Sequence, residues 1–367
     1  MSAPRRRKAV VAMSGGVDSS VAAALLVDEG FDVTGVMLKL WRGEDVATGS
    51  GCCSVGAADD ARRVADVLGI PFYVFDFAQR FEDTVVADFR AEYASGRTPN
   101  PCVRCNAWIK FDALLERARV LGADVLATGH YARVRHAGGR YRLLRGVDAR
   151  KDQSYVLWML GQRELERCRF PVGEMDKTTT RRIAADLGLR TAAKPDSQEI
   201  CFVRDGDVGA YVERHVAHAA RSGAIVDRYG RRVGEHRGIG RYTVGQRRGL
   251  GVSLGAPVFV TGIDARTNTV VVGARADLDV ASVRVREARF VDRPPAPGER
   301  VLLQHRAHGD AAPGAVARVA DDAFDVAFDA PASALAPGQS AVLYAAERPD
   351  EVVGGGIVAS TVPVAVA

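Results

Sequence analysis

The stretch Ser14-Gly15-Gly16-Val17-Asp18-Ser19-Ser20 decides the fold, because it joins an apolar strand to a helix. The strand is predicted over Lys8 to Met13 and the helix over Val21 to Glu29. Two glycines let the backbone turn tightly, and the first N–H groups of the helix have no partners within it, so they point at whatever binds there. Such a loop is an anion site in an α/β protein, and phosphate oxygens are its natural ligand.

The end of this loop separates it from a Walker A motif. A Walker A loop closes with Gly-Lys-Ser or Gly-Lys-Thr, whereas Asp18-Ser19-Ser20 stands here and no lysine of the loop reaches a γ-phosphate. Ser-Gly-Gly-x-Asp-Ser instead resembles the pyrophosphate loop of the ATP pyrophosphatases, which adenylate an oxygen and release pyrophosphate. A glycine-rich turn without function is the alternative, since short glycine motifs recur by chance. The resemblance implies an ATP site at Met13, Ser14, Gly15, Gly16, Val17, Asp18, Ser19 and Ser20.

Length and composition are typical of a soluble protein with several domains. The chain has 367 residues, more than one core usually accommodates, and its hydrophobic content of 47% is ordinary for a globular protein. No segment is long enough to span a bilayer and nothing near the start resembles a signal peptide, so a cytoplasmic location without membrane partners is expected. A net charge of +5 permits binding to nucleic acid without requiring it.

The pattern of apolar segments predicts three domains, at residues 1–208, 209–278 and 279–367. Up to about Ile200, strands alternate with helices, which predicts α/β architecture with a doubly wound parallel sheet and ligands beyond the carboxyl ends of its strands. A small, mostly β central module follows, and beyond about Ala281 short strands predict a β-barrel. The strands expected in the sheet are Lys8 to Met13, Asp32 to Leu38, Phe72 to Phe77 and Val125 to Thr128.

Cys102-Val103-Arg104-Cys105 follows two prolines and precedes a helix predicted from Ala107. A thiol at a helix N-terminus lies in a positive field, which lowers its pKa below the ordinary value of about 8.5. Three interpretations stay open: half of a zinc site, inert core thiols, or reactive thiol chemistry. No second Cys-x-x-Cys accompanies the first, and prolines beside two thiols fit a core poorly, so the pattern favours reactive chemistry.

Cys201 lies in a second loop, Lys194 to Phe202. Together with the pyrophosphate loop and the Cys-x-x-Cys, it makes the chain resemble the tRNA-specific 2-thiouridylases, which form 2-thiouridine at the wobble position (U34) of tRNA. The likeness spans nearly the whole chain and implies a sheet of the adenine-nucleotide α-hydrolase type. Shorter segments in the same order support it: Ala127-Thr128-Gly129-His130-Tyr131, Lys151-Asp152-Gln153-Ser154-Tyr155, Tyr242 to Leu250, and Pro337 to Val342.

The resemblance implies that Cys105 is the catalytic nucleophile and that Cys201 carries a persulfide sulfur. ATP and Mg²⁺ are the implied cofactors: ATP adenylates the C2 oxygen of uracil, a poor electrophile, and sulfur then replaces that oxygen. The sulfur attacks directly from the persulfide, or as sulfide released when Cys105 attacks Cys201. Both routes leave a disulfide between Cys105 and Cys201, and the sequence does not separate them.

The resemblance also implies further contacts for ATP and for tRNA. Leu38 and Gly129 complete the nucleotide site, and Asp18 is expected to hold Mg²⁺ rather than only to stabilise the helix, because hard oxygen ligands suit that ion. For the 151–153 segment a solvated turn is the alternative, and for Gln339 it is turn chemistry after Pro337. The residues implied to contact tRNA are Asn100, Pro101, Cys102, His130, Lys151, Asp152, Gln153, Gln304, His305 and Gln339.

Two positions depart from the family pattern. Many relatives carry an aspartate where Cys102 stands, which leaves the acid/base group of the reaction open. Gln304-His305-Arg306 stands where relatives have Arg-Tyr pairs that touch tRNA. Elsewhere, Arg231-Arg232 and Arg247-Arg248 are predicted to meet phosphates, with a solvated basic face as the alternative.

Three functions are therefore compared. The first is an ATP-dependent sulfurtransferase acting on tRNAs for Lys, Glu and Gln, supplied by a cysteine desulfurase or a sulfur-relay protein. The second is another pyrophosphate-loop ligase or amidotransferase, for which two distant thiols have no use. The third is an RNA-binding protein that senses nucleotide and does not need Cys201. Cys52, Cys53 and Cys168 are interpreted as spare thiols.

Overall fold

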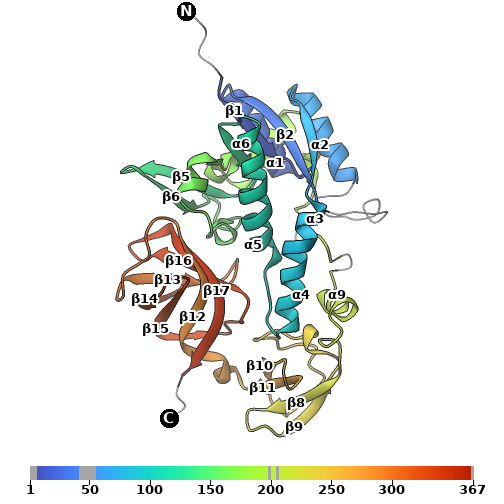
Figure 1. Ribbon diagram of the computed structural model, residues 1–367, viewed down its shortest axis with the longest axis vertical. Coiled ribbons are helices and arrows are strands. Elements are labelled where there is room, and N and C mark those ends of the chain that lie inside the picture. The colour runs from blue at the N-terminus through green and yellow to red at the C-terminus, as the bar shows by residue number, and fades with distance from the viewer. Residues whose placement is uncertain (1–5, 41–54, 197–199, 204–205, 365–367) are drawn as a thin grey trace, which may run out of the picture. The chain divides into compact units, whose positions relative to one another are not determined.

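The computed structural model describes residues 6–40, 55–196, 200–203 and 206–364 (Figure 1). The chain forms two compact units. The first contains residues 1–85, 102–204 and 350–352, and the second contains residues 86–101, 205–349 and 353–367. Each unit is therefore assembled from segments far apart in the sequence. Within the described residues, no helix has the length and apolar character that crossing a membrane requires.

The first unit is built on a parallel sheet of five strands in the order β3-β2-β1-β4-β7. Ala9, Val10 and Val11 of β1 are at most 4% exposed, as expected for a parallel strand covered on both faces. Figure 1 shows α1 and α2 beside β1 and β2. The predicted α/β sheet is confirmed, with strands β1 (Lys8–Ala12), β2 (Asp32–Lys39), β3 (Phe72–Asp76), β4 (Val125–Thr128) and β7 (Cys168–Arg169).

Several helices begin earlier than the sequence predicts. The prediction that the first helix starts at Val21 is wrong, because Gly16 is extended and caps a helix that begins at Val17. Helical turns also begin at Pro101 rather than at Ala107, since proline suits the first position of a helix. The bounds are α1 (Val17–Asp28), α2 (Val55–Leu68), α3 (Ala78–Phe81), α4 (Ala87–Ala94), α5 (Pro101–Cys105), α6 (Leu115–Val120), α7 (Gln162–Arg167), α8 (Lys177–Asp186) and α9 (Val208–His215), with π-helical segments at Glu82–Val86 and Asn106–Leu114.

A hairpin of β5 (Ala132–Ala137) and β6 (Arg140–Arg145) extends the first unit beyond the sequence-based prediction. Gly138 and Gly139 form its turn with φ of +60° and +73°, a conformation that favours glycine. Leu143 and Leu144 of β6 pair with Val352 and Glu351, so residues 350–352 belong to this unit.

The second unit contains a four-stranded sheet in the order β10-β11-β8-β9. Ile225, Val260, Val270 and Val272 form its buried apolar side, each at most 1% exposed. This sheet matches the expectation of a small, mostly β module after the first domain. Its strands are β8 (Gly223–Asp227), β9 (Arg232–His236), β10 (Phe259–Asp264) and β11 (Thr269–Gly273).

A closed antiparallel barrel follows, in the order β12-β15-β14-β13-β16-β17, and the pairing of β12 with β17 closes it (Figure 1). Its core contains Val285, Leu303, Val326, Leu343 and Val358, all at most 1% exposed. The predicted barrel is confirmed, although the sequence-based prediction lacks the strand that closes it. The bounds are β12 (Asp279–Phe290), β13 (Arg300–Gln304), β14 (Ala312–Val319), β15 (Ala323–Ser333), β16 (Ser340–Ala345) and β17 (Arg348–Pro363).

Two glycines let β17 approach β12 closely. A Cβ atom at Gly354 would lie 2.3 Å from the carbonyl oxygen of Arg289, and one at Gly356 would lie 2.5 Å from that of Arg286. Neither distance is compatible with a side chain, so the closure of the barrel requires glycine at both positions.

We predict that Gly356→Ala loosens the barrel at its closing seam. The added methyl group forces β12 and β17 apart, which costs about 1–3 kcal/mol of unfolding free energy. Hydrogen exchange of the amides in β12 and β17 should become faster. The matched control is Gly56→Ala, where a Cβ atom meets nothing within 4 Å. Unchanged exchange in both strands would contradict the prediction.

Candidate active site

The loop between β1 and α1 is held in shape by its own serines. The Ser19 hydroxyl accepts a hydrogen bond from the Ser14 N–H (3.2 Å) and donates to the Gly16 carbonyl (3.1 Å), to which Ser20 also donates (2.8 Å). Gly15 has φ of +69°, and a Cβ atom there would lie 2.2 Å from the Ala57 carbonyl oxygen. The loop is thus fixed as a turn whose open N–H groups head α1, the arrangement that binds phosphate.

Gly129, at the carboxyl end of β4, lies directly against the first turn of α1. A Cβ atom at Gly129 would lie 2.6 Å from both the Asp18 carbonyl carbon and the Ser19 nitrogen. Ala12 of β1 pairs with Thr128 of β4, so the two strand ends bring these segments together. The structure therefore unites the predicted loop with the predicted nucleotide contact at Gly129.

The Asp18 carboxylate is held by two residues that the sequence analysis does not single out. Lys177 donates from Nζ to both of its oxygens at 2.7 and 2.9 Å, and the Tyr131 hydroxyl lies 2.9 Å from Oδ1. Burial, reinforced by Asp18 and only partly offset by the hydrogen bond with Thr180, raises the pKa of Tyr131 well above its ordinary range, so its hydroxyl stays protonated. Asp18 is thus a carboxylate held in the first turn of α1, directly after the loop, and carboxylate oxygens are suitable donors for Mg²⁺ beside phosphate.

One sequence signal points to Lys177. It is the first residue of α8, directly after the N-cap Asp176, whose side chain accepts from Thr179 N at 2.6 Å. The helix dipole disfavours a cation at this end, so a buried lysine there requires anionic partners. The Asp-Lys pair at the start of α8 is a local signal, but the burial of Lys177 and its contacts emerge only in the folded chain.

Met13 and Leu38, the remaining predicted nucleotide contacts, are both buried at the carboxyl ends of β1 and β2. The Met13 N–H donates to the Val36 carbonyl at 2.8 Å, which ties the two strand ends together. Met13 and Leu38 thus provide buried apolar side chains at two strand ends, from the first of which the phosphate loop begins. Trp41 and the predicted spare thiols Cys52 and Cys53 lie outside the described residues.

The Cys-x-x-Cys motif lies within α5, not in a loop before a helix. Cys102 is exposed and Cys105 is buried at 9% exposure. The next residue, Asn106, donates from Nδ2 to the Val156 carbonyl at 2.9 Å and accepts from Lys110 Nζ at 2.9 Å. Cys105 therefore occupies a firmly packed helical turn.

Cys201 is half-buried and precedes two buried residues, Phe202 and Val203. The Phe202 ring packs edge-on against Phe81 of α3, with centroids 6.0 Å apart. Cys201 and Cys105 are not joined in a disulfide in this structure. Three residues of the preceding Ser197-Gln198-Glu199-Ile200 segment, 197–199, lie outside the described residues.

Among the residues that the structure describes, the other thiols and the histidines do not assemble a metal site. Burial raises the pKa of the Cys168 thiol far above its usual range, which fits an inert thiol. His215 and His218 form a His-x-x-His pair at the end of α9, but their ring nitrogens bond to the carbonyls of Tyr211 and Ala94 at 2.8 Å. No cluster of three or more potential ligands forms within the described part of the chain, so the zinc interpretation finds no support.

Several residues of the first unit that are predicted to contact tRNA also form hydrogen bonds within the protein. His130 is buried, its Nδ1 lies 2.6 Å from the Thr128 hydroxyl, and burial lowers its pKa so that the ring stays neutral. Gln153 Oε1 accepts from the Tyr131 N–H at 3.0 Å, and the Gln153 N–H donates to the Tyr131 carbonyl at 2.8 Å. Buried Asp152 accepts from Arg145 and from Ser154. Contact of these residues with tRNA stays a prediction.

In the second unit, Gln339 is bound to the segment that leads to Asn100 and Pro101. Its Nε2 donates to the Thr98 carbonyl at 2.6 Å, and the Thr98 N–H donates to the Pro337 carbonyl at 2.8 Å. Gln304 is 2% exposed and donates to the carbonyls of Arg306 and Ala307, a structural role beside its predicted contact with tRNA.

A cavity of about 440 Å³ lies beside these residues in the second unit. Nδ1 of His305 is buried, and among the described residues it has no hydrogen-bond partner. Burial, reinforced by the charge of Arg306, lowers the pKa of His305 to about 4. The lining combines polar and apolar groups, which suits a base or ribose, and it consists of Thr243, Val244, Gly245, Gln246, His305, Arg306, Ala334, Ala336 and Gln339.

In the central module, Arg231 and Arg232, which are predicted to meet phosphates, form ion pairs within the module. Arg231 pairs with Asp227 at 2.6 Å and Arg232 with Glu235 at 2.9 Å. Both arginines keep most of their side chains exposed, so a solvated basic face and a phosphate contact both remain compatible with the structure.

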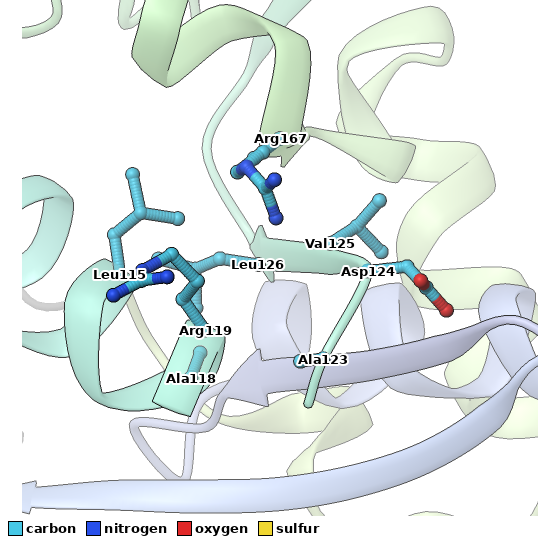
Figure 2. A pocket seen from close by; sticks show the side chains of 8 residues that line it. All are labelled: Leu115, Ala118, Arg119, Ala123, Asp124, Val125, Leu126 and Arg167. Atoms are coloured by element: carbon cyan, nitrogen blue, oxygen red, sulfur yellow. The ribbon is translucent and has the colours of Figure 1, made fainter. Parts of the chain in front are cut away.

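A crevice at the amino end of β4, opposite the strand ends that carry the phosphate loop, is not part of this site (Figure 2). Asp124 and Val125 stand at the amino end of β4, whereas the phosphate loop and Gly129 lie at the carboxyl ends of the strands. Asp124 accepts from the Lys8 N–H at 2.7 Å, which fastens the start of β1. Figure 2 shows the aliphatic side chains of this lining together with Arg119, Arg167 and Asp124.

The parallel sheet, its phosphate loop and Gly129 define a nucleotide-binding domain, and family comparisons place it in a known class. Residues 7–205 match the family described as tRNA methyl transferase HUP domain. Residues 209–274 match a tRNA methyl transferase PRC-barrel domain, and residues 280–358 match an aminomethyltransferase β-barrel domain.

Relatives identify the family more closely. The tRNA-specific 2-thiouridylase MnmA of Roseiflexus castenholzii is 47% identical over 371 residues, which cover 96% of this chain and 99% of that protein. Its counterpart in Clostridium perfringens is 45% identical and covers 97% of this chain and 99% of its own length. This chain belongs to the family of tRNA-specific 2-thiouridylases, which confirms the resemblance seen in its sequence.

Among solved structures, a 4-thiouridine synthetase in complex with RNA and bound ATP is 18% identical. It covers 57% of this chain and 50% of its own, at a TM-score of 0.36, and we base no conclusion on it.

We predict that Gly129→Ala weakens nucleotide binding without unfolding the sheet. The methyl group meets the backbone at Asp18 and Ser19, which cannot yield without displacing the phosphate loop. Calorimetric titration with ATP should show an affinity at least about tenfold lower, a loss of roughly 1.4 kcal/mol. Gly56→Ala serves as the control, and ATP affinity equal to wild type in Gly129→Ala would refute the proposed packing.

We also predict that His305 makes the protein less stable in acid. Its folded pKa of about 4 lies below the ordinary value of 6.5, so between these values only the unfolded chain takes up the proton. Stability contributed by the neutral ring is complete above pH 6.5 and is lost as the pH falls toward 4. In urea unfolding, wild type should lose roughly 1–2 kcal/mol more than His305→Gln between pH 7 and pH 5. Equal losses in the two proteins would contradict the assignment.

Proposed function

We propose that this protein is an ATP-dependent sulfurtransferase that converts the wobble uridine of tRNA into 2-thiouridine and releases AMP and pyrophosphate. One observation carries the proposal. The chain matches 2-thiouridylases over 96% of its length, and its phosphate loop, Cys105 and Cys201 all belong to one compact unit.

The phosphate loop supports the first half-reaction, adenylation of the uracil C2 oxygen. That oxygen attacks the α-phosphate, the bond to the β-phosphate breaks, and pyrophosphate departs. The N–H groups at the start of α1 would bind the phosphate oxygens. When bound, Mg²⁺ neutralises phosphate charge, and Asp18 is the residue that would hold it, because its carboxylate stands in the first turn of α1, directly after the loop.

The cysteines support the second half-reaction, replacement of the adenylated oxygen by sulfur. In one route, the terminal sulfur of a Cys201 persulfide attacks C2, AMP leaves, and the Cys105 thiolate then attacks the Cys201 sulfur and frees the thiolated base. In the other, Cys105 attacks first and releases hydrosulfide, which attacks C2. Each route forms one Cys105–Cys201 disulfide, and a thiol reductant supplies two electrons to reopen it.

The substrate contacts proposed for tRNA lie in both units. His130, Lys151, Asp152 and Gln153 belong to the first, together with Cys102. Asn100, Pro101, Gln304, His305 and Gln339 belong to the second, where the cavity beside His305 suits a base taken out of the anticodon stack. The proposed acceptors are the tRNAs for Lys, Glu and Gln, and a cysteine desulfurase or sulfur-relay protein would load Cys201.

A ligase or amidotransferase with the same phosphate loop finds no support in the comparisons. Amide formation needs only an adenylated oxygen and an amine, so it gives no role to two thiols 96 positions apart in the sequence (201 minus 105). Their presence is the feature that separates the two functions.

We predict that both cysteines are required when sulfur comes from a cysteine desulfurase and free cysteine. Unmodified tRNA incubated with the protein and Mg-ATP should yield 2-thiouridine by nucleoside mass spectrometry, whereas Cys105→Ala and Cys201→Ala should reduce the yield by at least about a hundredfold, as expected for removal of a nucleophile. Cys168→Ala, which changes a buried thiol, should leave it unchanged.

The same assay with free sulfide as the sulfur source distinguishes the role of Cys201 in sulfur delivery and tests the proposal. Free sulfide should restore 2-thiouridine in Cys201→Ala, because Cys201 then no longer has to deliver sulfur. If wild type releases AMP and pyrophosphate but forms no thiolated nucleoside with either sulfur source, the substrate proposed here is wrong.

A further inference from the structure

A buried lysine connects two carboxylates beside the phosphate loop. The Lys177 side chain is 11% exposed, and its Nζ contacts Asp18 at 2.7 Å and Asp196 at 2.6 Å. It also lies 5.6 Å from the centre of the Tyr131 ring. A buried ammonium with these partners is held in one place, within direct reach of the loop that carries Asp18.

Asp196 contacts three cationic side chains, although its carboxylate carries a single negative charge. Besides Lys177 it contacts Lys151 Nζ at 2.8 Å and Arg181 at 3.4 Å. Burial opposes its ionisation, but hydrogen bonds from Lys151 and Lys177 prevail and hold the pKa of Asp196 below its ordinary value. Asp196 is therefore a fixed anion that, together with Asp18, holds the Lys177 ammonium.

A second lysine contacts the loop itself. Lys194 Nζ donates to the Gly15 carbonyl at 2.9 Å and to Asp60 at 2.8 Å. Four cations, Lys151, Lys177, Arg181 and Lys194, thus surround three carboxylates, Asp18, Asp60 and Asp196. The excess of positive charge beside a loop with open N–H groups favours a polyanionic ligand.

The sequence of the loop makes this arrangement informative. Ser14 to Ser20 contain no lysine, unlike a Walker A loop, in which a lysine reaches the terminal phosphates. In the folded chain a lysine reaches the same loop from a separate element, the first turn of α8. Lys177 therefore brings to this loop the positive charge that the lysine of a Walker A loop supplies.

We propose that Lys177 is a phosphate-binding residue that holds the β- and γ-phosphates of ATP, the part that departs as pyrophosphate. This inference rests on the proposed function and extends it to a residue that the family resemblance did not supply. Asp196 is a positioning residue, since it keeps the ammonium beside the loop through their 2.6 Å contact. The adenosine and the α-phosphate are outside the role of Lys177.

The test compares three ligands with the purified full chain, without tRNA or a sulfur source. Affinities for ATP, pyrophosphate and AMP are measured by calorimetry with Mg²⁺ and again with EDTA. Lys177→Met should weaken ATP and pyrophosphate at least about tenfold and AMP less than about twofold, because loss of one charge-assisted contact affects only ligands that carry the terminal phosphates. Lys177→Arg should retain most of the affinity.

Two controls separate phosphate binding from a structural role. Lys8→Met removes the same charge at the amino end of β1 and should behave as wild type. Lys177→Met combined with Asp196→Asn also removes one of the two carboxylates that lose their contact with Lys177 in the single variant. The double variant should recover thermal stability but not affinity for pyrophosphate.

Either of two results would overturn the inference: equal weakening of AMP, ATP and pyrophosphate in Lys177→Met, or recovery of pyrophosphate binding in the double variant. These outcomes differ from failure of the proposed function. If wild type binds neither ATP nor pyrophosphate, the ATP chemistry itself is wrong. If wild type binds both and thiolates tRNA while Lys177→Met binds pyrophosphate normally, only the role of Lys177 is wrong.

Discussion

The contact between the backbone of Gly129 and the first turn of α1 is the constraint on which the active site depends. No side chain fits between them, since a single Cβ atom would lie 2.6 Å from Asp18 and Ser19. The ends of β1 and β4 therefore fix the phosphate loop from two sides, with Ala57 behind Gly15 as a third support. Once the loop is fixed in this way, the direction of the Asp18 side chain is fixed too, and it faces Tyr131 and Lys177.

The electrostatics of the site follow from that geometry. A turn with open N–H groups accommodates phosphate, but this loop carries an aspartate and no cation of its own. Lys177 begins α8 and Lys194 follows a short helical turn, and both reach the loop from segments more than 150 positions away. The phosphate site is thus a property of the folded unit, because its charge is complete only when these segments have packed against the loop.

The sequence predicts those features that arise from local patterns. Apolar runs locate β1 to β4, and Ser14 to Ser20 locate the loop, because strands and glycine turns leave short, regular signals. Among the strands that escape prediction, two have clear physical reasons: the apolar residues of β6 stand among arginines, one of which pairs with Glu351, and the glycines of β17, which lower strand propensity, serve its approach to β12. The contacts of Lys177 with Asp18 and Asp196 depend on tertiary packing, and no local pattern encodes them.

The position of β17 has a consequence for how the protein forms during translation. Glu351 and Val352 pair with β6, more than 200 positions earlier, while Gly354 to Pro363 pair with β12. The ribosome therefore makes β6 long before it makes β17, and it makes β12, the first strand of the barrel, before the strand that closes the barrel. Such non-local pairing slows folding and exposes unpaired strand edges in the nascent chain. Completion of both units must wait for the same late segment, so the chain becomes a finished protein in a single late step.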